Sequence, residues 1–263
     1  MIVVFLLLVL YWLYYYLKLF NPFKLILIIG KKGSGKSTTA VSMIKSYQGS
    51  KQLFYDSNLK KWQVFRWQVY TNISGLLVDG VRFINAPERL GDLSFPPFSF
   101  VVIDEVNLLP GWDNREFKKM NKSTINWLRY QRKHMVRVLL ISQTFDIDKK
   151  IRSLTDSMFL NKCLLGCFSV LRKIDKTVDI ESSALDADSQ LVDKLSFAPW
   201  WIPFSGNIKF LFIPKYMNLF QSYDPPSLPS FDYVQISCPK KKKKRFNLFR
   251  KRFRSVRRSR SVN

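Results

Sequence analysis

The sequence is short of acidic residues, histidine and cysteine, and these shortages limit what the protein can be. It has 19 Asp and Glu against 43 Lys and Arg, one histidine and three cysteines in 263 residues. His134 cannot complete a zinc site with Cys163 and Cys167 at any familiar spacing, and Cys238 stands apart. The cysteines are therefore interpreted as buried, reduced thiols of a cytosolic domain.

Charge is missing altogether from the opening segment, because Lys18 is the first charged residue. As a helix, residues 1–20 would be about 30 Å long, which is one hydrocarbon core. Tyr and Trp crowd the end of this run, as in an aromatic belt. A basic start and a small-residue cleavage site are absent, which argues against a cleaved signal peptide. We therefore predict a transmembrane or membrane-embedded helix over 1–20, with a buried helix or a strand as alternatives.

The charges that flank this segment predict its orientation. Lys18, Lys24, Lys31 and Lys32 all lie on its C-terminal side. Positive residues favour the cytoplasmic side of a membrane. We therefore expect a single-pass protein whose remaining chain lies on the cytoplasmic side.

Acidic residues are also absent from the last part of the chain. Residues 240–263 hold six Lys and seven Arg, which is +13 of the net charge of +24. Such a segment cannot bury a core, so we predict a disordered basic tail after a linker over 225–239. Its expected partners are phosphates of lipid or of nucleic acid. Three Phe lie among the basic residues, and single-stranded DNA is favoured because the opening segment already supplies an anchor.

Glycines are few, yet three of them gather in the segment "GKKGSGKS", which fits the pattern G-x-x-x-x-G-K-[ST]. In this pattern, backbone N–H groups cradle phosphates, Lys36 reaches the β- and γ-phosphates, and the Ser37 hydroxyl holds Mg²⁺. The loop follows an apolar run and precedes a helical segment, as a phosphate-binding loop requires. The predicted ligands are ATP and Mg²⁺. The predicted nucleotide-binding residues are Gly30, Lys31, Lys32, Gly33, Ser34, Gly35, Lys36, Ser37 and Thr38.

An acidic pair supplies the second half of the predicted site. In "FSFVVIDEVN" an apolar strand from Phe100 to Ile103 ends in Asp104 and Glu105. Asp104 is predicted to bind Mg²⁺ through water, together with Ser37. Glu105 is predicted to be the general base that polarises the attacking water. A general base favours hydrolysis over mere nucleotide binding.

The rest of the chain predicts an α/β fold: a P-loop NTPase with a mostly parallel sheet flanked by helices. Strand-like patterns lie at 60–74, 80–91 and 136–145, and a short helix followed by a strand is expected over 146–165. A helix is expected over 122–137 with Ser123 as its N-cap. Gln143 lies at the end of the strand within 136–145 and is either a γ-phosphate sensor or an ordinary strand-end hydrogen bonder. In 195–214, Pro and Gly residues exclude a second membrane-spanning helix.

Several segments resemble the zonula occludens toxin (Zot) family, the assembly ATPases of filamentous phages. The resemblance covers roughly residues 24–224. It rests on "VYTNIS", on "IDEVNLLPGWDNR", on "MNLFQSYD" and on a block from "LRYQRKHMVRV" to "IRSLTD". The matching residues are Trp112, Arg115, Arg132, Lys133, His134, Ser142, Gln143, Ile147, Asp148, Ile151 and Arg152.

The resemblance implies a membrane-anchored ATPase that drives assembly and extrusion of a filamentous single-stranded-DNA phage. Implied partners are the host inner or cytoplasmic membrane, phage coat or DNA-binding proteins, and single-stranded DNA. A homo-oligomeric ring is implied in which Arg115, Arg129, Arg132 or Arg152 acts on a neighbouring subunit's nucleotide. In this family the membrane helix usually follows the ATPase domain, whereas here it precedes it.

Two other functions stay open at this point. One is a DNA-packaging or conjugation-type DNA translocase, which the basic tail suits. The other is a membrane-tethered, nucleotide-switched protein that binds nucleic acid or lipid, against which Glu105 argues. The predicted domains are the helix at 1–20, the ATPase domain at 24–224, the linker at 225–239 and the tail at 240–263.

Overall fold

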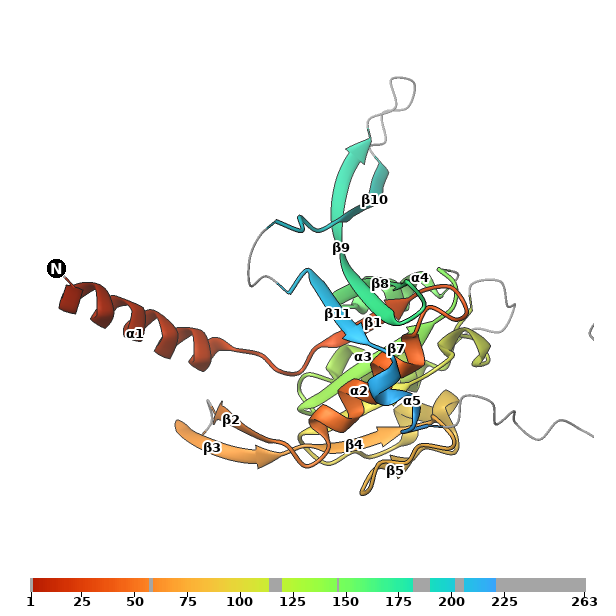
Figure 1. Cartoon of the computed structure of the whole chain (residues 1–263), viewed down its shortest axis with the longest axis horizontal. Helices are drawn as coiled ribbons and strands as arrows, with labels where there is room; N and C mark the ends of the chain where they lie inside the picture. Colours follow the sequence, from red (N-terminus) through yellow and green to blue (C-terminus); the bar gives the residue numbers. More distant parts are fainter. Residues whose placement is uncertain are drawn as a thin grey trace, which may run out of the picture. The chain divides into compact units, whose positions relative to one another are not determined.

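The computed structural model describes residues 2–56, 59–113, 120–145, 147–181, 190–201 and 206–220. The predicted linker and basic tail, and Arg115, lie outside these residues, and the predicted domain limits stay predictions. Figure 1 labels the α-helices and strands. Together with the 3₁₀ helices η1 and η2, these are the elements of the described chain. They are α1 (Ile2–Leu19), β1 (Leu25–Ile29), α2 (Lys36–Tyr47), β2 (Lys51–Asp56), β3 (Lys61–Arg66), β4 (Gln68–Thr71), β5 (Arg82–Phe83), η1 (Pro87–Asp92), β6 (Ser99–Ile103), η2 (Val106–Leu108), α3 (Lys122–Tyr130), β7 (Val136–Ser142), α4 (Lys149–Leu154), β8 (Ser157–Leu164), β9 (Phe168–Glu181), β10 (Gln190–Phe197), β11 (Ile208–Phe212) and α5 (Pro214–Met217).

The described strands form one large mixed sheet and a separate hairpin of β2 and β3. The order in the sheet is β10-β9-β8-β1-β7-β6-β4-β5, and β11 pairs with β9. The pairs from β5 to β8 are parallel, whereas β9 pairs antiparallel with β8, β10 and β11. The predicted α/β fold with a mostly parallel sheet is therefore confirmed. An important detail is that β7 lies between β1 and β6.

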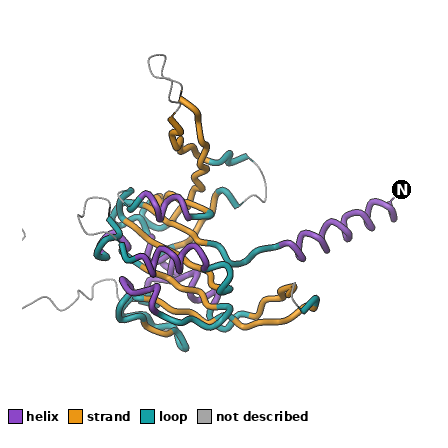
Figure 2. The backbone as a smooth tube through the Cα atoms, turned by 180° about the vertical axis from the view of Figure 1, so that it is seen from behind, coloured by secondary structure: helices purple, strands orange, loops and turns teal. Residues whose placement is uncertain are grey.

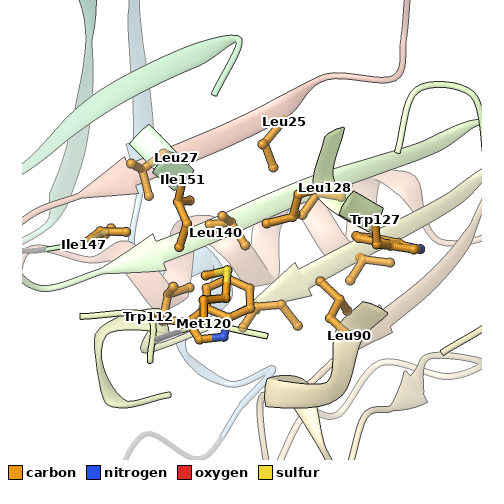
Figure 3. Close-up of a cluster of buried hydrophobic side chains, with 14 of the residues drawn as sticks. Leu25, Leu27, Leu90, Trp112, Met120, Trp127, Leu128, Leu140, Ile147 and Ile151 are labelled. Carbon is orange, nitrogen blue, oxygen red and sulfur yellow. The ribbon is translucent and has the colours of Figure 1, made fainter. Parts of the chain in front are cut away.

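Each face of the sheet carries a hydrophobic core, because successive side chains of a strand point to opposite faces. On one face, Leu27 of β1 and Leu140 of β7 pack in a cluster with Trp112, Leu128 of α3 and Ile151 of α4. Figure 3 shows these side chains gathered over the strands, with Met120 beside Trp112. This face is therefore the one that α3 and α4 cover.

The neighbouring residues of the same strands build the core of the other face. Ile26 and Ile28 of β1 share a cluster with Ala40 and Ile44 of α2 and with Phe100 of β6. All five residues of β1 and of β6 are buried, as expected of strands covered on both faces. Figure 2 shows the helices packed along the strands, so the predicted flanking of the sheet by helices is confirmed.

Three local predictions are corrected. Cys163 is exposed and Cys167 is half-buried, so the prediction of buried thiols is wrong for both. Helix α3 ends at Tyr130 rather than at residue 137, and its N-cap is Asn121 rather than Ser123. The Asn121 side chain accepts a hydrogen bond from the Ser123 backbone N–H at 3.2 Å, as a capping oxygen does for a first-turn amide. A turn then leads directly into β7, and Met135 within it has a left-handed backbone with φ of 55°.

The N-terminal helix is confirmed as a helix over Ile2–Leu19. Its side chains from Phe5 to Leu17 are largely exposed. Among the helices of the described chain, none combines the length and the apolar character that a membrane crossing requires, so the predicted transmembrane span is not borne out. The end of α1 contacts the β2–β3 hairpin, where the Lys18 Nζ lies 4.9 Å from the centroid of the Tyr55 ring.

The two-sided core leads to a prediction about stability. Leu140 is fully buried, whereas Leu77 is 62% exposed. We expect Leu140→Ala to lower the free energy of unfolding by about 2–5 kcal/mol, because it leaves a cavity. Leu77→Ala should change it by less than about 0.5 kcal/mol. Urea unfolding of both variants is the measurement, and equal losses would contradict this description of the core.

Candidate active site

The predicted site residues meet at one edge of the sheet, where the parallel strands end. The glycine loop links the end of β1 to α2, the acidic pair follows β6, and Gln143 follows β7. Because β7 lies between β1 and β6, these three strand ends are neighbours. Ligands of open α/β sheets bind in the crevice at the carboxyl ends of the strands. The topology therefore places all the predicted site residues at the edge where such ligands bind.

The loop needs its glycines for conformation and for space. Gly33 and Gly35 have φ of 75° and 85°, a left-handed conformation that other residues rarely adopt. A Cβ at Gly30 would lie 2.5 Å from the Asn161 carbonyl oxygen and 2.8 Å from the Ser34 Oγ. The loop is therefore held close to β8, and its shape depends on residues without side chains.

Lys36 is a cation held largely out of water. Its Nζ donates a hydrogen bond to the Lys31 carbonyl oxygen at 2.8 Å, and the residue is buried. Burial lowers the pKa of Lys36, and the nearby charges of Asp104 and Glu105 oppose this effect in part. Within the part of the chain that the structure describes, this ammonium group bonds only to a carbonyl, so it is well suited to an incoming anion. In a glycine loop that anion would be a phosphate.

Ser37 and Asp104 form the contact that joins the loop to β6. The Ser37 hydroxyl donates a hydrogen bond to Asp104 Oδ2 at 2.8 Å. Burial raises the pKa of Asp104, while the hydrogen bonds from Ser37 and from the Glu105 N–H act in the opposite direction. A hydroxyl and a carboxylate are hard oxygen ligands of the kind that Mg²⁺ prefers.

No cluster of three or more His, Cys, Asp or Glu that could hold a metal occurs in the described part of the chain. Mg²⁺ is commonly held by one or two carboxylates together with the phosphates of a substrate. The Ser37–Asp104 pair would therefore hold the ion only jointly with a bound nucleotide.

Glu105 lies directly after Asp104 in an unusual backbone conformation. Its φ and ψ are 53° and 46°, the left-handed region, which costs a non-glycine residue about 1–2 kcal/mol. The Gln143 Nε2 donates a hydrogen bond to Glu105 Oε1 at 2.9 Å. Glu105 remains exposed, so its carboxylate is oriented by Gln143 and is still accessible to water.

Sequence reasoning missed two asparagines that position these groups. The Asp104 N–H donates to Asn72 Oδ1 at 2.7 Å, and Asn72 Nδ2 donates to the Asp104 carbonyl at 3.0 Å. Asn107 Oδ1 accepts hydrogen bonds from the Ser142 hydroxyl at 3.3 Å and from the Gln143 N–H at 3.4 Å. Each asparagine follows a buried strand within a few residues, at the same edge of the sheet, and this position could have identified both as site residues.

A pocket of about 600 Å³ opens beside the loop and extends towards β8. Gln143, Phe145 and Asn161 line it together with loop residues, including Ser34. The Ser34 Oγ and the Asn161 Nδ2 are buried and have no hydrogen-bond partner among the residues that the structure describes. Buried polar groups without partners are rare, so these two atoms are suited to a polar ligand in the pocket. Sequence reasoning did not identify Asn161.

Three of the four predicted arginine candidates lie away from this edge, and the fourth, Arg115, is outside the described residues. Arg129 and Arg132 precede β7 and are exposed, whereas Gln143 follows β7. The seven residues of β7 correspond to about 23 Å of strand. Arg152 lies in the last turn of α4, ahead of β8. An arginine that completes the site would thus have to come from another subunit if it is one of these three.

Among the comparisons with known proteins, only the comparison with solved structures found similar chains. No family model matches the chain, and no curated protein sequence matches it. The N-terminal domain of zonular occludens toxin from Neisseria meningitidis is 21% identical, with 57% of this chain and 83% of that chain covered and a TM-score of 0.41. The genome packaging NTPase B204 from Sulfolobus turreted icosahedral virus 2, solved with sulfate, is 13% identical, with 59% and 92% covered and a TM-score of 0.40. The first of these is from the family whose motifs the sequence resembles.

The raised pKa of Asp104 predicts opposite effects on folding and on binding. A raised pKa means that the folded chain binds this proton more tightly than the unfolded chain, so stability falls as pH rises through that pKa. Asp104→Asn should therefore make the ligand-free protein more stable at neutral pH, with a smaller gain at mildly acidic pH. The same variant should lose Mg²⁺-dependent nucleotide binding, because a carboxylate ligand is gone.

Urea unfolding at both pH values and nucleotide titration with and without Mg²⁺ would measure these two effects. A variant that is less stable at neutral pH and still binds the nucleotide with Mg²⁺ would contradict the role given to Asp104.

Proposed function

We propose that the chain is an ATPase that hydrolyses ATP with Mg²⁺ at the edge of β1, β7 and β6. One observation carries this proposal: Glu105, oriented by Gln143 at 2.9 Å, lies next to the Ser37–Asp104 pair at the mouth of the glycine loop. A protein that only binds a nucleotide needs the loop but not an exposed, oriented carboxylate beside it. The arrangement thus favours turnover over a nucleotide switch.

Each residue has a separate task in this proposal. The loop and Lys36 bind the phosphates, and Ser37 and Asp104 hold the metal, which supplies positive charge to the phosphates. Glu105 accepts the proton of the attacking water. The water oxygen forms a bond to the γ-phosphorus, the bond from that phosphorus to the β–γ bridging oxygen breaks, and ADP and phosphate leave. Gln143 positions the Glu105 carboxylate and takes part in sensing the γ-phosphate.

We further propose that this ATPase drives the assembly and extrusion of a filamentous single-stranded-DNA phage. The motifs between Val69 and Asp156 that resemble the Zot family support it. The proposed location is the host inner or cytoplasmic membrane, with the ATPase domain on the cytoplasmic side, where ATP is available. The exposed apolar side chains of α1 support attachment to this membrane. Partners would be phage coat or DNA-binding proteins and single-stranded DNA.

A homo-oligomeric ring belongs to the same proposal. Phosphoryl transfer commonly uses an arginine supplied by a neighbouring subunit. Arg129 and Arg132 are exposed and lie far along β7 from their own site, so they are suited to act on a neighbour. Arg115 remains a candidate from the sequence.

A DNA-packaging or conjugation-type translocase is the second candidate function. It would use the same hydrolytic site, and the +13 charge of residues 240–263 favours it. Single-stranded DNA should stimulate ATP turnover strongly in a translocase that moves DNA. Turnover that responds to phage coat protein and not to DNA would favour the assembly function.

Glu105→Gln tests the hydrolytic site. The carboxamide cannot accept a proton, so turnover should fall by about 10²–10⁴-fold while ATP still binds. Glu88→Gln, the same chemical change in η1, should leave turnover unchanged. Lys36→Ala should instead weaken nucleotide binding itself. Phosphate release and titration with a fluorescent ATP analogue would measure these effects, and wild-type turnover by Glu105→Gln would show that Glu105 is not the base.

A further inference from the structure

Three cations come together at the opposite edge of the sheet, on the face that α2 covers. Lys24 immediately precedes β1, and its carbonyl accepts a hydrogen bond from the Val138 N–H at 3.1 Å, so Arg137 in β7 is its neighbour. The Lys209 Nζ, from β11, lies 5.5 Å from the centroid of the Phe159 ring. Lys209 also lines one pocket with Ile26 of β1, two residues after Lys24, so the three cations belong to one region. Burial lowers the pKa of Lys209, and the charges of Arg137 and Lys24 lower it further.

These cations have no counter-charge within the described ranges of the chain. None of the three has a carboxylate within 4.0 Å there. Arg137 donates one hydrogen bond from Nη1 to the Pro22 carbonyl at 3.0 Å and lies over the Tyr47 ring, and its buried Nε has no hydrogen-bond partner among the described residues. The Asp156 carboxylate accepts a hydrogen bond from the Leu25 N–H at 2.7 Å and forms no ion pair with them. Clustered cations repel one another, and the half-buried Arg137 is in addition partly removed from water. An external anion would relieve both costs.

Exposed aromatic side chains lie on either side of Lys209 along the chain. Phe210 is 70% exposed, and Trp200 and Trp201 are 66% and 70% exposed. The two tryptophans lie close to the start of β11, because Asn207 Nδ2 donates a hydrogen bond to the Pro199 carbonyl at 2.9 Å. Exposed tryptophans beside basic residues are typical of a surface that meets the headgroup region of a membrane.

The same region is the place where α1 joins the domain. Pro22, which Arg137 holds, comes shortly after the last residue of α1, and Phe23 is buried in the core of this face. Figure 1 shows the chain running from α1 directly into β1. A membrane that receives the exposed apolar side chains of α1 would therefore lie close to the three cations.

We propose that Lys24, Arg137 and Lys209, with Trp200, Trp201 and Phe210, form a basic-aromatic surface that binds the phosphate headgroups of anionic lipids. This inference rests on the membrane location proposed above. Basic and aromatic residues also suit single-stranded DNA. Lipid is favoured because the surface is continuous with α1, and because Lys209 and Phe210 line a mainly apolar pocket of about 160 Å³.

The test compares two double variants of the full chain. Lys24→Gln with Lys209→Gln removes two exposed cations of this surface and leaves the half-buried Arg137 in place. The matched control, Lys122→Gln with Lys150→Gln, removes two exposed cations of α3 and α4, the helices that cover the other face of the sheet. Both variants keep the basic tail, so its contribution to binding is the same. Affinities are measured for vesicles of phosphatidylcholine and for equimolar phosphatidylcholine and phosphatidylglycerol.

We expect the Lys24 and Lys209 pair to bind the anionic vesicles about tenfold or more weakly than the wild type, given the attraction of basic residues to anionic membranes. The control pair should lose less than about twofold. Binding to neutral vesicles, which reports on α1, should be equal in all three proteins. A chain that binds neither kind of vesicle would disprove the membrane location together with this inference.

Two results would overturn the inference and leave the membrane location standing. One is an equal loss of anionic-vesicle affinity in both double variants, which would indicate only diffuse charge. The other is unchanged vesicle binding with a selective loss of single-stranded-DNA binding in the Lys24 and Lys209 pair, which would assign the surface to nucleic acid.

Discussion

The active site depends on the hydrogen bond of 2.8 Å between the Ser37 hydroxyl and the Asp104 carboxylate. It joins the loop after β1 to the end of β6, although β7 separates the two strands in the sheet. The contact therefore requires that β1, β7 and β6 end at the same level, which their parallel registers ensure. The inserted β7 then brings Gln143 to the middle of the site, where it orients Glu105.

Burial sets the electrostatics of the site. Without a ligand, Lys36 and Asp104 are each partly removed from water, so the pKa of the lysine is lowered and that of the aspartate is raised. Both shifts disfavour the charged forms that the proposed chemistry uses. Phosphate oxygens beside the lysine and a divalent cation beside the aspartate would reverse both effects. Nucleotide and metal should therefore bind cooperatively. The phosphates bring negative charge to the metal site, and the metal brings positive charge to the phosphate site.

The sequence predicts those parts of the fold that are encoded locally. β1 is a continuous apolar run, and β6 and β7 are largely apolar apart from residues such as Arg137, as expected of strands buried on both faces. The glycine loop has a fixed spacing. β9 is not predicted, since its mixed polar pattern becomes a strand only by pairing with β8 and β11. Asn72 and Asn161 are missed for a related reason. Asn72 acts on a residue 32 positions away, and Asn161 approaches the loop only because β8 lies beside β1.

The most direct test of the account is a crystal structure of the chain with ADP, Mg²⁺ and aluminium fluoride, which imitates the transferring phosphoryl group. The account predicts phosphates within the loop of residues 30–37, the metal between Ser37 and Asp104, and a water molecule next to the Glu105 carboxylate. Nucleotide bound elsewhere, or a metal distant from both Ser37 and Asp104, would contradict the claim that this edge of the sheet is the hydrolytic site.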